Sequence, residues 1–177
     1  MSRPSWEVRA VRREDAPAIL GLVHECFEEY RDFAPPGWEP STDRAGPRER
    51  MEAGLSRPST GGWVGESDGV HAGHVLWIPA SESERMGTED AALGYVWQLF
   101  VAPRHRGSGL AAGLMAAMLE AARERYGEMR LLTPRDHARA RRFYEREGWT
   151  LLGDWGLDSD LRLPVVEYGM RLSTRQN

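Results

Sequence analysis

The sequence predicts an α/β fold with one mixed sheet. Segments with the two-residue period of strands and the 3.6-residue period of helices follow one another in the order β-α-(α)-β-β-β-α-β-α-β-β. The stretch Ala92–Val101 is short and almost entirely apolar, which is typical of a buried central strand. No repeat, low-complexity segment or linker divides the chain, so we expect residues 1–177 to form a single domain.

The N-terminal half contains three expected strands and two expected helices. In chain order these elements cover Trp6–Val11, Asp15–Tyr30, Arg48–Leu55, Gly62–Ser67 and Gly69–Ile78. The first strand alternates apolar and polar residues, and the long helix places Val23 and Phe27 on one face, with Asp15 as its N-cap. The Pro- and Gly-rich stretch Phe33–Pro47 is an expected loop, and Asp68-Gly69 is a dipeptide typical of hairpin turns.

The C-terminal half alternates strands with two further helices. In chain order the expected elements cover Ala92–Val101, Ser108–Tyr126, Met129–Thr133, Arg135–Glu147, Trp149–Gly153 and Val165–Leu172. Leu110, Leu114 and Ala122 line the buried side of the first of these helices, and Gly148 is expected to cap the second. We expect the last two strands to flank a loop that contains Trp155.

The composition excludes several classes of function. All 23 basic residues are arginines, which excludes a Walker-A phosphate loop and a lysine Schiff base with pyridoxal phosphate, because both need a lysine. The formal net charge of −4 gives no electrostatic reason to bind nucleic acid or an anionic membrane. No signal peptide or membrane span is recognisable, and we expect a cytoplasmic protein that binds neither nucleic acid nor membrane.

The cysteine and histidine residues indicate neither a disulfide nor a metal site. The single cysteine, Cys26, cannot form an internal disulfide. It lies near the buried face of the first helix, where a packed thiol is expected rather than a nucleophile. No cysteine and histidine residues have the spacing of metal ligands, so we expect no metal.

The glycine-containing stretch Arg104–Gly109 lies between the expected buried strand and the next helix. The first backbone N–H groups of a helix have no partner inside it and carry the positive end of its dipole. Gly107 and Gly109 let this backbone approach a phosphate closely, and Arg104 and Arg106 add positive charge. The stretch therefore indicates an anion site, and the alternative is a tight turn with solvated arginines.

A dinucleotide-binding loop explains this stretch less well. The G-x-G-x-x-G pattern would need glycine where the chain has Ala112, and Gly113 comes one residue late. The stretch also follows strands in a hairpin pattern, whereas a dinucleotide loop opens a βαβ unit.

Two motifs resemble those of the GCN5-related N-acetyltransferase (GNAT) superfamily. Arg104-His105-Arg106-Gly107-Ser108-Gly109 matches the signature of Gln or Arg, two residues, Gly, one residue, then Gly or Ala. Ala140, Tyr144, Gly148 and Trp149 match the family's A-x-x-x-Y-x-x-x-G-[FW] pattern. The order of strands and helices extends the likeness toward the N-terminus. The resemblance implies a mixed, mostly antiparallel sheet flanked by helices and splayed between its fourth and fifth strands.

The resemblance also implies acetyl-CoA as the acyl donor and direct transfer of its acetyl group to a primary amine. The pantetheine arm would lie beside the end of the fourth strand, where a backbone N–H near Leu99–Phe100 would polarise the thioester carbonyl. The diphosphate would lie on the amides from Arg106 to Ala111, and one or two arginines of the last helix could reach the adenosine 3′-phosphate. The implied cofactor-binding residues are Leu99, Phe100, Val101, Arg104, Arg106, Gly107, Ser108, Gly109, Leu110, Ala111 and His137, the last standing where the family often has Asn.

The resemblance places one catalytic residue and leaves another open. Tyr144 stands at the family's usual position for the general acid, near the CoA sulfur, and packing against Phe143 is the alternative. Many relatives carry Glu or Asp on the fourth strand as the base, whereas this chain has Trp97-Gln98, which cannot accept a proton at neutral pH. An amine of low pKa would need no base. The remaining candidates are a water held by backbone carbonyls and the side chains of Glu66, His71 and His74.

The acceptor is expected to be a small primary amine. Acidic residues in two regions that border the acceptor pocket of relatives could steer a cationic amine, and tryptophans could stack on it. The alternative interpretation, with the acids in solvated loops and the tryptophans in the core, is the stronger of the two. The acids are Glu28, Glu29, Asp32, Glu82, Glu84, Glu89 and Asp90, and the tryptophans are Trp38, Trp63, Trp77, Trp97 and Trp155. Alternative functions are a non-catalytic acyl-CoA-binding module and an acetyltransferase of protein lysines or N-termini. A homodimer is a tendency of the family.

Overall fold

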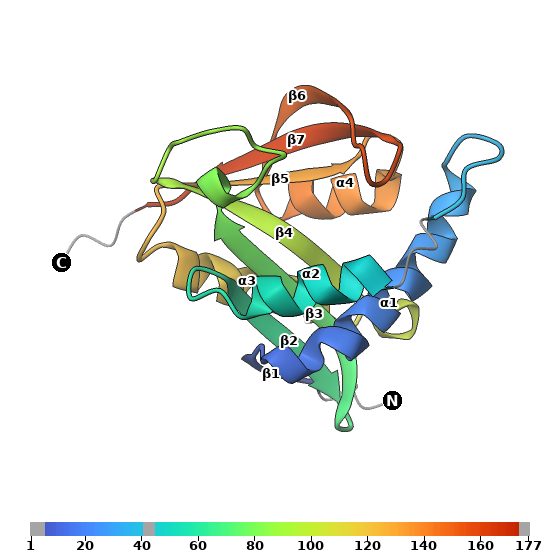
Figure 1. The fold of residues 1–177 in the computed structure, drawn as a ribbon, viewed down its shortest axis with the longest axis horizontal. Helices are drawn as coiled ribbons and strands as arrows, with labels where there is room; N and C mark the ends of the chain where they lie inside the picture. Colours follow the sequence, from blue (N-terminus) through green and yellow to red (C-terminus); the bar gives the residue numbers. More distant parts are fainter. Residues whose placement is uncertain (1–5, 41–44, 174–177) are drawn as a thin grey trace.

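The strands form one mixed sheet in the order β1-β2-β3-β4-β5-β7-β6. Figure 1 shows this sheet in a computed structural model of the chain, which describes residues 6–40 and 45–173. The strands are β1 (Trp6–Ala10), β2 (Gly61–Ser67), β3 (Val70–Pro79), β4 (Leu93–Val101), β5 (Glu128–Pro134), β6 (Thr150–Leu157) and β7 (Pro164–Arg171). All neighbours pair antiparallel except β4 and β5, which are parallel. The mixed, mostly antiparallel sheet is thereby confirmed.

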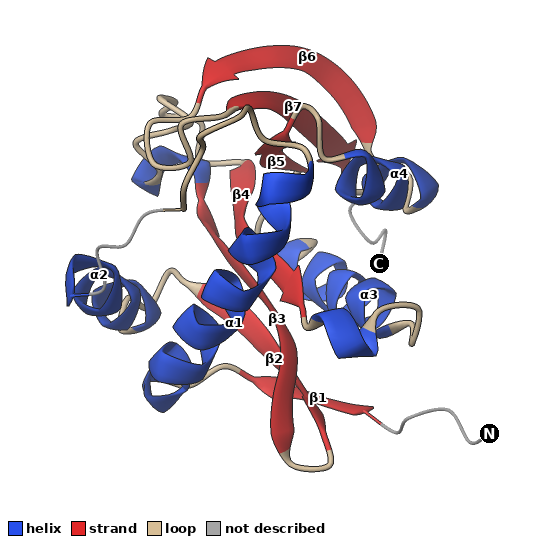
Figure 2. Cartoon of the chain, turned by 90° about the vertical axis from the view of Figure 1, so that its right-hand side faces the viewer, coloured by secondary structure: helices blue, strands red, loops and turns tan. Residues whose placement is uncertain are grey.

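Helices cover both faces of this sheet. In the described part of the chain they are α1 (Ala16–Glu28), α2 (Ala45–Leu55), α3 (Leu110–Ala122) and α4 (Ala138–Arg146). Figure 2 shows α1 and α2 on one face and α3 and α4 on the other. None of the helices in residues 6–40 and 45–173 has the length and apolar character needed to cross a membrane.

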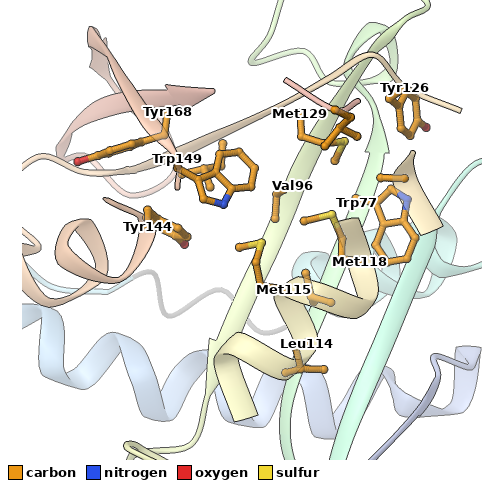
Figure 3. Packing of buried hydrophobic residues seen from close by; sticks show 14 of the residues in the cluster. Trp77, Val96, Leu114, Met115, Met118, Tyr126, Met129, Tyr144, Trp149 and Tyr168 are labelled. Atoms are coloured by element: carbon orange, nitrogen blue, oxygen red, sulfur yellow. The ribbon is translucent and has the colours of Figure 1, made fainter. Parts of the chain in front are cut away.

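The main apolar core lies between the sheet and the pair α3 and α4. Leu114 and Met118 of α3 and Met129 of β5 have no exposed surface, and Figure 3 shows them with Tyr168 and Trp149 in one cluster. Full burial of a leucine or methionine side chain contributes about 1.5–3 kcal/mol. This packing fixes α3 against β4 and β5, and so it fixes the loop from which α3 begins.

The strands β4 and β5 diverge after a short stretch of pairing. Their register covers only Leu93, Gly94 and Tyr95 of β4, whereas β5 pairs with β7 along its whole length, from Glu128 to Pro134. Residues 96–101 of β4 still pair with β3, but their backbone groups on the opposite side face no strand. The splay that the resemblance implies between the fourth and fifth strands is therefore present. A register shift lies opposite Trp97, between the pairs Leu76–Gln98 and Trp77–Val96.

Two local expectations differ from the structure. Trp155 belongs to the edge strand β6 rather than to a loop, because Gly153 and Gly156 sit at register shifts that break the alternation without ending the strand. Asp15 does not cap α1 through its side chain, since that carboxylate instead accepts hydrogen bonds from the Arg12 backbone N–H at 2.7 Å and from the Arg9 guanidinium at 2.8 and 2.9 Å.

The remaining boundary differences are smaller. The helix expected at Arg48–Leu55 begins earlier, at Ala45, and residues 41–44 of the expected preceding loop lie outside the described residues. Gly148 follows α4 with a φ of +90°, which confirms it as the residue that lets the helix end there.

Candidate active site

The divergence of β4 and β5 opens a cavity of about 750 Å³. Its wall is formed by α1 and α2 from one face of the sheet, by the start of α3 and by α4 from the other, and by β4 and β5 between them. The residues predicted from sequence that line it are Leu99, Phe100, Val101, Arg106, Gly107, Gly109, Leu110, Ala111, His137 and Tyr144. Arg104 and Ser108 do not line it. The local motifs and the sheet topology thus bring most of the predicted residues to one place.

The loop before α3 presents unpaired amides to this cavity. Gly107 and Gly109 have φ values of +73° and +87°, a region that favours glycine. The intervening N–H of Ser108 donates to the His105 carbonyl at 3.3 Å, and the N–H of Leu110 donates to the Ser108 hydroxyl at 3.3 Å. The loop and helix N–H groups without an acceptor in the described residues are those of Gly107, Gly109, Ala111 and Ala112.

The space in front of these amides is open. A Cβ built on Gly107 or Gly109 would have no heavy atom within 4 Å. Four N–H groups without acceptors at the start of a helix, beside two glycines with open space around their missing Cβ atoms, can hold an anion such as a diphosphate.

The two sides of the cavity mouth are joined by one carboxylate. Glu29, just after α1, binds the Arg106 guanidinium of the loop at 2.5 Å and the Arg139 guanidinium of α4 at 2.9 Å. These two cations lower the pKa of Glu29, so its carboxylate stays ionised. Arg104 instead points to Glu25, at 3.8 Å, and to the backbone oxygen of His71, at 3.5 Å.

The arginines of α4 divide between the cavity and the surface. Arg139, Arg142 and Arg146 line the cavity, and Arg142 has no acidic partner among the described residues. Arg141 is engaged elsewhere, by the Tyr168 hydroxyl at 3.0 Å. Arg135 lies beside Asp136 at 3.7 Å. A free guanidinium beside the anion loop is suited to a further phosphate group.

Tyr144 is buried and keeps its proton. Its ring lies in an aromatic cluster, 5.4 Å from the ring centre of Phe143, 6.2 Å from Trp149 and 5.9 Å from Tyr168 (Figure 3). Burial raises the pKa of Tyr144 well above its ordinary value. The side chain lines the cavity and its hydroxyl has no hydrogen-bond partner among the described residues. Tyr144 can therefore donate its proton to a group in the cavity.

The side chains considered from sequence as bases do not reach the cavity. Glu66 is held by the Arg9 guanidinium at 2.7 Å. His74 is fully buried, and burial lowers its pKa to about 3. Burial also lowers the pKa of His71, whose Nε2 lies 3.1 Å from Nδ1 of His74. The Oε1 atom of Gln98 lies 3.0 Å from Nε2 of His74. Gln98, which is not a base, lines the cavity, whereas neither of the two histidines does.

His137 and Cys26 contribute neutral surface to the cavity. His137 stacks on Phe33 with ring centres 4.7 Å apart, and burial lowers its pKa to about 4. The Cys26 thiol lies 3.7 Å from the Val101 carbonyl, and burial raises its pKa to about 11. A protonated thiol at neutral pH agrees with the expected packing role rather than with a nucleophile.

The side chains that line the half of the cavity under α1 and α2 differ from those that the sequence indicated. None of the seven acids considered for steering lines it, and Asp160, which does line it, is bound by Arg85 at 2.6 Å. Trp38 and Trp97 line it, whereas Trp63 and Trp77 pack in the core and Trp155 is exposed on β6.

Sequence reasoning missed three charged residues of this wall, which are Arg50, Arg85 and Asp160. Arg50 forms no ion pair with an acidic side chain of the described residues. All three lie in segments with no motif, so no local signal distinguishes them from solvated charges. Within residues 6–40 and 45–173, no group of three or more His, Cys, Asp or Glu side chains is placed so that it could hold a metal ion.

The sheet opens beside a helix start with unpaired amides, and a buried tyrosine lines the opening, as the resemblance to acetyltransferases that use acetyl-CoA implies. The model of the acetyltransferase (GNAT) family matches residues 23–149. This chain belongs to that family and is an N-acetyltransferase with acetyl-CoA as its acyl donor.

Individual relatives agree with this assignment. A protein of Archaeoglobus fulgidus named an uncharacterized N-acetyltransferase is 30% identical over 143 residues, which are 78% of this chain and 88% of that protein. The fold is similar to a GNAT-family acetyltransferase from Staphylococcus aureus Mu50, with a TM-score of 0.73 and 14% identity over 96% of this chain and 100% of the other. It is also similar to yncA from Salmonella typhimurium, solved with its cofactor acetyl-CoA, with a TM-score of 0.71 and 16% identity over 98% and 97% of the two chains.

Proposed function

We propose that residues 1–177 form one domain that transfers the acetyl group of acetyl-CoA directly to the primary amine of a small molecule. The observation that carries this proposal is the cavity of about 750 Å³, which extends from the loop before α3 to the wall formed by α1 and α2. Sites for small molecules have volumes of about 300–1,000 Å³. The enclosure of the acceptor side by Trp38, Trp97 and Met51 supports a small acceptor over an extended peptide.

The chain's own groups fit acetyl-CoA at three places. The unpaired amides of Gly107, Gly109 and Ala111 would bind the diphosphate. The free side of β4 at Leu99–Val101 would pair with the amides of the pantetheine arm, as an added strand does. Arg142 would meet the 3′-phosphate. When bound, acetyl-CoA supplies a thioester whose carbonyl carbon is open to attack by an amine and whose sulfur is the leaving group.

Tyr144 is proposed as the general acid. Its hydroxyl is protonated at neutral pH because burial raises its pKa, and the described residues provide no competing acceptor for that proton. The hydroxyl would release the proton to the leaving sulfur, which prevents the thiolate from reversing the transfer.

No side chain is proposed as the base. Glu66, His71 and His74 do not line the cavity, and Gln98 is not basic. The proton of the attacking amine would pass to a water held by backbone carbonyls on the unpaired side of β4, or the amine would enter already neutral. We therefore expect kcat/KM to rise with pH as the amine of the acceptor loses its proton.

The proposal is tested by supplying acetyl-CoA and panels of small primary amines and of peptides, and by detecting free thiol. Turnover with small amines and not with peptides is expected. Turnover of lysine or N-terminal peptides alone would establish the protein acetyltransferase alternative. Tight binding of acetyl-CoA in calorimetry without any turnover would instead establish the non-catalytic module, an alternative that the neutral Gln98 on β4 favours.

Two further expectations belong to this proposal. The first is the cytoplasmic location expected from the sequence. Fractionation of cells would test that location. The homodimer expected from the resemblance stays a prediction, which light scattering of the purified protein would test.

A further inference from the structure

Three side chains form a hydrogen-bonded row from the interior of the sheet to the cavity. Nε2 of His71 lies 3.1 Å from Nδ1 of His74, and Nε2 of His74 lies 3.0 Å from Oε1 of Gln98. His74 is completely buried in the middle of the row. Gln98 is half-buried and lines the cavity at its end. The side chain of Gln98 in the cavity wall is therefore held by His74 and His71 of β3.

The protons of the row have only two possible arrangements. Both rings are neutral at neutral pH, because burial lowers both pKa values, so each ring carries one proton. In the first arrangement His71 donates to His74, and His74 donates to the amide oxygen of Gln98. In the second arrangement every bond is reversed, and the amide nitrogen of Gln98 donates to His74.

The buried end of the row decides between the two. Nδ1 of His71 is buried and has no partner among the described residues. The second arrangement would place an N–H there without an acceptor, whereas the first leaves only a lone pair, and orphaned buried N–H groups are the rarer of the two in proteins. The first arrangement is favoured, and it turns the amide nitrogen of Gln98 away from His74.

The free amide nitrogen of Gln98 then faces the cavity. It has no acceptor among the described residues, and it is not among the buried nitrogen atoms that lack a partner. Such a group donates two hydrogen bonds and accepts none, so it repels an ammonium and attracts oxygen. The neighbouring walls do not reverse this preference, since Arg50 is also a donor and Asp160 is occupied by Arg85.

We propose that Gln98 is a specificity-determining residue whose side-chain N–H₂ group, oriented by His74 and His71, donates to an oxygen atom of the acceptor. The site would then select primary amines that carry a hydroxyl or carbonyl oxygen close to the reactive nitrogen. This inference rests on the proposed function, because it specifies the acceptor of that same cavity. In this scheme His74 and His71 are positioning residues that act through Gln98.

The orientation is testable without any acceptor. Nitrogen-15 NMR of the full-length protein distinguishes the two tautomers of a neutral histidine. We expect His71 and His74 both to carry their protons on Nε2, with neither ring becoming charged between pH 6 and 8. A proton on Nδ1 of His74 would mean the reversed row and would overturn the proposal.

The selectivity is tested with matched amines. The pair 2-amino-1-phenylethanol and 2-phenylethylamine differs by one hydroxyl next to the aminomethyl carbon. We expect kcat/KM of the wild type to be about tenfold higher for the hydroxylated amine, the worth of one well-placed hydrogen bond. Gln98→Leu should bring the ratio of the two kcat/KM values to about one, and an equal preference in wild type and variant would refute the role of Gln98.

A positioning variant separates orientation from simple packing. In His74→Leu the Gln98 amide is free to rotate, so KM for the hydroxylated amine should rise several-fold while kcat and the kinetics of the deoxy amine stay unchanged. A loss that is equal for both amines would show a structural role only. Turnover of both amines without preference rejects this inference alone, whereas binding of acetyl-CoA without turnover of any amine rejects the proposed function.

Discussion

Gly107→Ala tests whether the loop before α3 binds the diphosphate of acetyl-CoA, and Gly69→Ala is its matched control. Gly107 has a φ of +73° and open space around its missing Cβ, and Gly69, at the hairpin between β2 and β3, has the same φ of +73° and the same open space. Only Gly107 lines the cavity. The two substitutions therefore impose the same backbone strain, and they differ in whether the new methyl group stands where a diphosphate would bind.

The expected loss of stability follows from the left-handed backbone conformation at both positions. A residue with a Cβ in this conformation costs about 1–2 kcal/mol, and in a domain of this size each kcal/mol lowers Tm by about 2–4 °C. Neither alanine clashes, so both variants should remain folded, with Tm lowered by about 2–8 °C. The methyl group at residue 107 should also disrupt at least one amide–phosphate hydrogen bond, worth about 1.5–3 kcal/mol, or about 10- to 150-fold in Kd for acetyl-CoA.

The assay is calorimetric titration with acetyl-CoA beside thermal unfolding of the two variants and the wild type. Gly69→Ala should bind as the wild type does, despite its lower Tm. If Gly107→Ala binds acetyl-CoA as tightly as Gly69→Ala, the diphosphate does not lie on this loop and the placement of the coenzyme is wrong.

Two further predictions concern proton chemistry. Tyr144→Phe should lower kcat by about 100-fold or more, as expected for loss of a general acid, with Kd for acetyl-CoA unchanged in calorimetry; an unaltered kcat would leave Tyr144 a packing residue. His74 has a folded pKa of about 3 against an ordinary value of 6.5, so between these values the unfolded chain binds more protons and stability falls as pH falls. Urea unfolding should show about 2 kcal/mol less stability at pH 5.0 than at pH 6.5 from His74 alone, and a stability that does not change over this range would contradict its neutral burial.

The conformation of the loop before α3 was predictable because its signals are local. The two glycines and the following helix lie within a few residues of one another, so sequence alone indicates both the backbone conformation and the free amides. Tyr144 was found in the same way, through a motif on one helix. The boundaries of β6 could not be predicted, because Gly153 and Gly156 interrupt the alternation of side chains although the pairing with β7 continues past them.

The role of Gln98 depends on pairing between distant segments. The sequence suggested His71 and His74 as separate candidates for a base, and it showed Gln98 only as a missing carboxylate. The register of β3 on β4, including its shift opposite Trp97, brings the three side chains into one row. Sequence patterns carry no signal for such a register shift, so the row could not be predicted.

The outermost strand has a consequence for the behaviour of the protein at high concentration. β6 is the last strand of the sheet and carries exposed apolar side chains, with Leu157 exposed at 70%. A long, flat strand of this kind would recruit another chain along its edge. The bulges at Gly153 and Gly156 interrupt the spacing of its free N–H and C=O groups, so an incoming strand cannot bond along its whole length. The same irregularity that conceals the second half of β6 in the sequence thus makes the addition of another strand along this edge less favourable.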